Sequence, residues 1–139
     1  MTLRYGEVYN SASLMADSKG ETMETSFSIS DRTSQDVPGI VIADLSGDLD
    51  TEAAYELESS LSDIVSRDGV KVVLNFSKIR IMNSTAMGVL LSAAEEARKR
   101  GGTMKLCSLS DHVREVLDLV GVSSLFEIFP TESEAVSSF

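Results

Sequence analysis

The sequence contains very few of the side chains that form disulfides and transition-metal sites. Its 139 residues include one cysteine, Cys107, and one histidine, His112. An internal disulfide is therefore excluded, and we expect no zinc site, because such sites take most of their ligands from these two residue types. We also expect no cofactor, since neither common glycine-rich phosphate loop occurs. Cys107 is predicted to be a small core residue and His112 a solvated surface residue.

Basic residues are also scarce. Lysine and arginine total 12 against 22 aspartates and glutamates, which gives a formal net charge of -10. Nucleic acids and anionic membrane surfaces attract proteins through lysine and arginine, so neither is an expected partner. The natural complement of such a chain is a protein with a basic surface.

Long hydrophobic runs are absent as well. The nearest candidates, residues 37–45 and 87–94, are far shorter than the roughly 20 residues of a membrane-spanning helix. We therefore expect no membrane insertion. We also expect no secretory signal, because no apolar core follows a basic N-terminal region. Together with the single cysteine, these absences favour a cytoplasmic location.

The hydrophobic content of 42% is sufficient for the core of one domain. Residues 1–24 follow no sustained apolar period and are predicted to be a flexible N-terminal extension. Residues 25–139 carry regular apolar patterns and are predicted to form the folded domain.

Within that domain, short apolar stretches alternate with amphipathic stretches of helical length. Strands are predicted over residues 27–30, 40–45, 70–76, 103–107 and 125–129. Helices are predicted to start after Asp50 or Thr51, at about Ser84, after Ser110 and after Thr131. This order predicts an α/β fold with a mixed, mainly parallel sheet and about four helices.

Three details of this assignment can be tested directly. Gly47 is expected to end the second strand, and residues 77–81 are expected to connect the third strand to the next helix. The helix after Ser110 is expected to turn four side chains toward the core, namely Val113, Val116, Leu117 and Val120.

Residues 82–91 (MNSTAMGVLL) contain the most informative polar cluster. The side chains of Asn83, Ser84 and Thr85 can each accept a hydrogen bond from the free N–H groups of a first helical turn. The N-terminus of a helix favours negative charge, including phosphate. The sequence therefore predicts a helix cap, with Ser84 as a candidate phosphorylation site and Thr85 as the alternative acceptor.

Three carboxylates surround the preceding strand-to-helix turn. Asp44, Asp48 and Asp50 can serve turn formation and helix capping, or they can form a binding rim near Ser84. Sites in parallel sheets collect at the carboxyl ends of the strands, which favours the rim. Both interpretations remain open from the sequence.

Catalytic constellations are missing from the sequence, so we predict that the protein is not an enzyme. A hydrolase or transferase using Ser84 as nucleophile would need a general base. The single histidine, His112, belongs to a different predicted helix. Cys107 is predicted to be packed among apolar residues, which does not favour a reactive thiol.

Two motifs together carry a family resemblance. The segment 45–50 (LSGDLD) precedes the first helix, and the segment 82–88 (MNSTAMG) opens the second. With this order of elements, residues 25–139 resemble the STAS domain, named for sulphate transporters and anti-sigma factor antagonists. The standalone bacterial antagonists are the most similar in length. Asn83 stands where their motif usually has aspartate, and Ala86 where it has glycine.

The resemblance implies a phosphorylation switch. In such antagonists the serine after the motif aspartate is phosphorylated by a partner that is both anti-sigma factor and serine kinase, and a serine phosphatase resets it. The matching residue here is Ser84. The unmodified protein binds that partner and so releases the sigma factor. The residues implied to contact the partner are Asp44, Asp48, Asp50, Asn83, Ser84, Thr85, Met87 and Gly88.

An alternative within the same family is a STAS subunit of a lipid-transporting ABC complex. Such a subunit would be a constitutive protein-binding module. Ser84 or Thr85 would then be a packing contact without a switching role.

Overall fold

A computed structural model describes residues 27–139. The extension predicted over residues 1–24 lies outside the described residues. Five strands form one sheet in chain order: β1 (Ser28–Thr33), β2 (Ile40–Leu49), β3 (Lys71–Met82), β4 (Thr103–Cys107) and β5 (Glu127–Phe129). β1 pairs antiparallel with β2, and all the other pairs are parallel. The predicted mixed, mainly parallel sheet is therefore confirmed.

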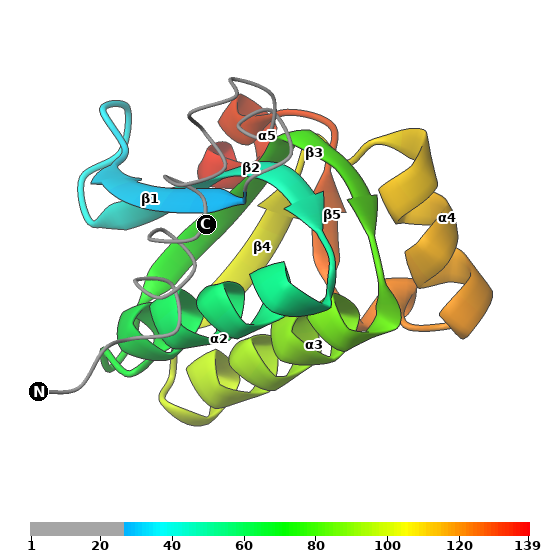
Figure 1. Cartoon of the computed structure of the whole chain (residues 1–139). Coiled ribbons are helices and arrows are strands. Elements are labelled where there is room, and N and C mark those ends of the chain that lie inside the picture. Colours follow the sequence, from blue (N-terminus) through cyan, green and yellow to red (C-terminus); the bar gives the residue numbers. More distant parts are fainter. Residues whose placement is uncertain (1–26) are drawn as a thin grey trace, which may run out of the picture.

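Four α-helices and one short 3-10 helix (Ser123–Leu125) complete the described domain. The α-helices are α2 (Thr51–Val65), α3 (Ser84–Lys99), α4 (Asp111–Val120) and α5 (Glu132–Ser137). In Figure 1, α2 and α3 lie side by side against one face of the sheet, α5 lies against the other, and α4 stands beside β3. None of the helices within residues 27–139 is long and apolar enough to cross a membrane.

The pleat of the strands distributes apolar side chains between two cores. In β2, Ala43 and Leu45 face α2 and α3, whereas Ile40 and Ile42 face α5. This alternation follows from the two-residue period of a strand. Cys107 lies in the smaller core beside α5 and is fully buried, as predicted. Burial raises the pKa of its thiol to about 11, so it carries little thiolate at neutral pH.

Two of the predicted strand ends are wrong. β2 continues through Gly47 to Leu49, and residues 77–81 belong to β3, which runs to Met82. Gly47 has a φ of 104°, a conformation that glycine adopts easily, and the β2–β3 register shifts on either side of it. The two strands therefore stay paired up to Leu49 and Met82, where α2 and α3 follow.

Three smaller expectations also need correction. Val120 is 57% exposed, because α4 turns only Val113 and Leu117 fully toward the core and Val116 partly. β1 continues to Thr33, beyond the predicted end at residue 30. The last strand begins at Glu127 instead of 125, because Ser123–Leu125 form a 3-10 helix.

We expect Gly102→Ala to lower the free energy of unfolding by about 2 kcal/mol or more. A Cβ atom at Gly102 would lie 2.4 Å from the backbone oxygen of Val70, so the backbone would have to shift. Gly88→Ala is the matched control. A Cβ at Gly88 meets open space, and removing a glycine from α3 should stabilise the fold by about 0.5–1 kcal/mol. Urea unfolding measures both changes, and equal stabilities would contradict the prediction.

Candidate functional site

The starts of α2 and α3 meet at the edge of the sheet where β2 and β3 end. Asp50 caps α2 by accepting a hydrogen bond from the Ala53 N–H at 2.8 Å. Asn83 caps α3 in the same way, with its side-chain oxygen 3.0 Å from the Ala86 nitrogen. Both caps confirm the sequence-based prediction.

Asn83 also ties the two helix starts together. Its backbone N–H donates to the Leu49 carbonyl at 3.0 Å, at the end of β2. Its side-chain nitrogen donates to the hydroxyl of Thr51, the first residue of α2, at 3.0 Å. These bonds fix the first turn of α3 relative to α2 and β2. The following residue, Ser84, is therefore held in a defined position.

Ser84 and Thr85 are exposed in the first turn of α3. Within the described part of the chain, neither hydroxyl makes a hydrogen bond to another residue. Their position at a helix N-terminus favours a negatively charged modification. Ser84 also has no hydrogen-bonded base among residues 27–139.

The residues that follow alternate between core and surface. Met87 is only 3% exposed and Ala86 is fully buried, so both pack beneath the first turn. Met87 therefore supports the site from below and does not offer the partner contact implied for it. Gly88 is exposed, and no atom lies within 4 Å of the place where its Cβ would be. The fully exposed residues of the site are thus Ser84, Thr85 and Gly88, beside the half-buried Asn83.

The structure brings two of the three predicted rim carboxylates to this edge. Asp50 caps α2 there, and Asp48 pairs with Arg80 of β3 at 2.9 Å. The Asp48 side chain is 16% exposed, whereas that of Arg80 is 73% exposed. Asp48 thus forms an ion pair with Arg80, whose side chain is otherwise exposed to solvent.

Asp44 does not belong to this rim. It lies on the face of the sheet that α5 covers, because the pleat places it on the same side as Ile42. Its carboxylate accepts two hydrogen bonds from Arg32, at 2.7 and 3.2 Å, and Arg32 also contacts Glu132 of α5 at 2.8 Å. Hydrogen bonds to Asp44 and Glu132 raise the pKa of the Arg32 guanidinium. Asp44 therefore helps to connect β1, β2 and α5.

The sequence analysis missed three contacts at this edge. Thr51 accepts the hydrogen bond from Asn83, and Arg80 pairs with Asp48. Ser110 caps α4 and donates its hydroxyl to the Arg80 carbonyl at 3.3 Å. Only the cap role of Ser110 had a local signal, because the other contacts depend on how β3 aligns with its neighbours.

Other chemistry has little support in the described residues. Residues 27–139 contain no group of three or more histidine, cysteine, aspartate or glutamate side chains that could hold a metal ion. His112 is exposed on α4, as predicted.

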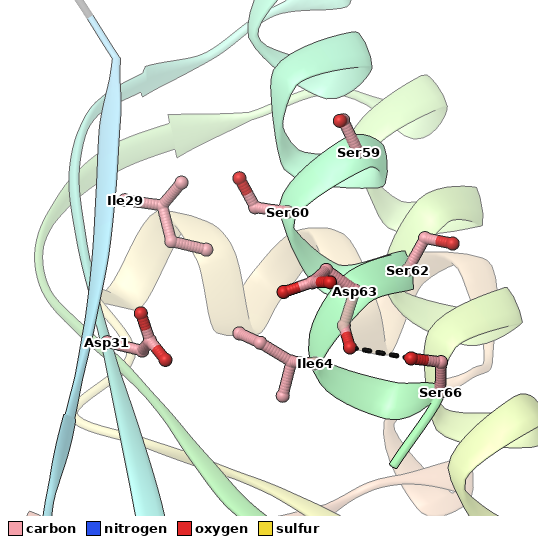
Figure 2. Close-up of a pocket in the computed structure, with 8 residues that line it drawn as sticks. All are labelled: Ile29, Asp31, Ser59, Ser60, Ser62, Asp63, Ile64 and Ser66. Carbon is pink, nitrogen blue, oxygen red and sulfur yellow. Dashed lines mark hydrogen bonds between the residues drawn. The ribbon is translucent and has the colours of Figure 1, made fainter.

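A polar hollow of about 660 Å³ lies between β1 and α2 (Figure 2). None of the predicted site residues lines it. Arg67 reaches two of its carboxylates, Asp31 at 3.8 Å and Asp63 at 3.5 Å.

Comparison with known proteins identifies related sequences. The model of the STAS domain family matches residues 32–135. A Bordetella bronchiseptica protein, BtrV, named for a proposed role as anti-sigma factor antagonist, is 31% identical over 107 residues. That alignment covers 77% of this chain and 92% of BtrV.

Comparison of structures gives the same picture of the fold. An anti-sigma factor antagonist from Mycobacterium paratuberculosis is similar with a TM-score of 0.71 and 20% identity, over 82% of this chain and 94% of that one. The antagonist SpoIIAA in its unphosphorylated form gives 0.64 with 24% identity, over 78% and 95%. The phosphorylated form of SpoIIAA, from Bacillus, gives 0.59 with 23% identity, over 78% and 98%. At these identities the likeness concerns the fold alone.

We expect Asn83→Ala to destabilise the protein by about 1–2 kcal/mol, because the cap of α3 and the bond to Thr51 are both lost. Asn83→Asp should change stability by less than about 0.5 kcal/mol, since a carboxylate also caps a helix and accepts from the Thr51 hydroxyl. Thermal unfolding with far-UV circular dichroism measures both. A large loss in Asn83→Asp would mean that the amide N–H is the essential contact.

Proposed function

The chain belongs to the STAS domain family, and we propose that it is an anti-sigma factor antagonist that phosphorylation of Ser84 switches off. The observation that carries this proposal is the exposed Ser84 hydroxyl at the capped start of α3. It occupies the position that the family motif gives to the regulatory serine. The name of the relative BtrV and the titles of the similar structures support the same class of function.

Phosphate at Ser84 would act through charge and volume at the surface. A phosphoserine adds about 1.5–2 negative charges at neutral pH. The helix N-terminus accommodates this charge, so the domain stays folded. A partner fitted to the unmodified edge would meet new bulk there, and the phosphate would have to lose part of its hydration for the contact to form. Binding would therefore weaken without unfolding.

The proposed partner is an anti-sigma factor that is also a serine kinase, with a serine phosphatase as the enzyme that resets the switch. The contact surface comprises Asn83, Ser84, Thr85 and Gly88 of α3, with Asp48 and Asp50 beside them. A basic surface on the partner would complement the net charge of -10. In this scheme the chain is a substrate and binding module in the cytoplasm, without catalysis of its own.

We expect Ser84→Asp to weaken partner binding by at least about tenfold while the fold is retained, because a bulkier carboxylate that must lose its water of hydration replaces a small hydroxyl in a fitted contact. Ser84→Ala is the control, since it removes the acceptor without adding charge and should bind like the unmodified protein. All three proteins serve as baits for a lysate of the source bacterium. Mass spectrometry identifies the retained kinase, and titration calorimetry with that purified kinase gives the affinities.

Other results of this experiment have clear meanings. A transport ATPase held equally by all three baits would support the alternative of a constitutive ABC subunit and contradict the sigma-factor proposal. A kinase held equally by the unmodified protein and Ser84→Asp would show that Ser84 is not the switch. Phosphate mapped to Thr85 after incubation with the kinase and ATP would move the switch by one residue.

We expect Gly88→Ala to weaken partner binding although it stabilises the fold. Glycine is unfavourable in a helix, and nothing in the described structure occupies the space beside it. The fold therefore does not require Gly88, whereas a partner backbone that approaches closely would. The same calorimetric titration tests this, with Ser133→Ala on α5, at the other face of the sheet, as control. Unchanged affinity would mean that the partner does not reach Gly88.

A further inference from the structure

A groove of about 290 Å³ lies between α2 and α3. Its floor is aliphatic and is formed by Leu61 and Val65 of α2 with Val89 and Ala93 of α3. Its rims are polar, with Glu58 on α2 and Ser92 on α3. The groove thus offers an apolar floor between hydrogen-bonding walls.

The groove continues the surface that starts at Ser84. Residues seven apart on a helix share a face, so Ser92 lies two turns beyond Thr85, and Glu58 lies two turns beyond Thr51. The two faces meet at the hydrogen bond between Thr51 and Asn83. Gly88 lies between Thr85 and Ser92 and adds no side chain that would obstruct the path. A partner segment seated on the first turn of α3 can therefore extend into the groove.

The charge of the groove indicates what such a segment carries. Of the four carboxylates of α2, Glu58 lines the groove. Across the groove, Glu96 is neutralised by Arg100 at 2.8 Å, and Arg100 also reaches Asp68. Glu58 is exposed and forms no ion pair within residues 27–139. An unneutralised carboxylate therefore stands above the aliphatic floor.

We propose that this groove binds a basic segment of the same partner, with an aliphatic side chain on the floor and a lysine or arginine beside Glu58. The inference rests on the proposed function, because it assigns a second contact to that partner. The groove begins at Val89, five residues beyond Ser84, so phosphate acts on one end of the interface only. The partner stays bound at the groove while it modifies Ser84. Once the contact at Ser84 is lost, the groove alone does not hold the partner, and it dissociates.

The test uses the purified kinase retained in the lysate experiment and the full-length chain. Glu58→Lys should raise the dissociation constant by about tenfold, because it places a cation where the partner brings one. Glu58→Gln, which disturbs the fold least, should raise it several-fold and reduce its salt dependence. Ser92→Phe, which fills the groove, should also weaken binding. The matched control is Glu115→Lys on the exposed side of α4, which should bind within about twofold of the unmodified protein.

The possible results separate the two proposals. If Glu58→Lys, Glu58→Gln and Ser92→Phe all bind like the unmodified protein while Ser84→Asp binds weakly, the groove proposal is overturned and the proposed function stands. If Glu115→Lys weakens binding as much as Glu58→Lys, the effect is one of net charge and the groove proposal is again overturned. If the unmodified chain retains no kinase, both proposals fail.

Discussion

The hydrogen bonds of Asn83 are the constraint on which the functional edge depends. Through its backbone N–H, its side-chain oxygen and its side-chain nitrogen, this residue joins the end of β2, the first turn of α3 and the start of α2. None of these bonds uses the side chain of Ser84. The Ser84 hydroxyl is therefore positioned by its neighbour and remains exposed. A modification at Ser84 can change the surface while the support beneath it stays intact.

The helix starts could be predicted from the local sequence, whereas the pairing between strands could not. Asp50, Asn83, Ser110 and Thr131 all cap helices as expected, because a cap depends on a side chain and the three residues after it. The ends of β2 and β3 were missed because Gly47 suggested a stop. Each strand is extended by pairing with the other, which the sequence does not display. Asp44 could have been placed by counting alternate residues from Ile42. Beyond the register shift at Gly47 that counting fails, so the contact between Asp48 and Arg80 could not have been predicted.

The distribution of ion pairs explains how an acidic chain presents its charge. Every arginine among residues 27–139 contacts at least one carboxylate, either between elements, as Arg32 does, or along a helix, as Arg114 does. Most of these pairs are exposed and contribute little to stability. Because each of these arginines is already paired, the carboxylates that remain have no arginine to neutralise them. On α2, Glu58 is exposed and forms no ion pair within residues 27–139, so it leaves a negative charge on the surface of that helix.

The alternation of buried and exposed residues along α3 has an evolutionary consequence. Ala86, Met87 and Leu90 belong to the core, whereas Ser84, Thr85 and Gly88 face outward from the same two turns. Under the proposed function, substitutions in the outward set would alter recognition at little cost to folding, so the two sets could diverge independently. A genome that duplicates this domain can therefore produce copies that answer to different partners within one cell. Such copies would be insulated from one another by a few surface residues on a shared scaffold.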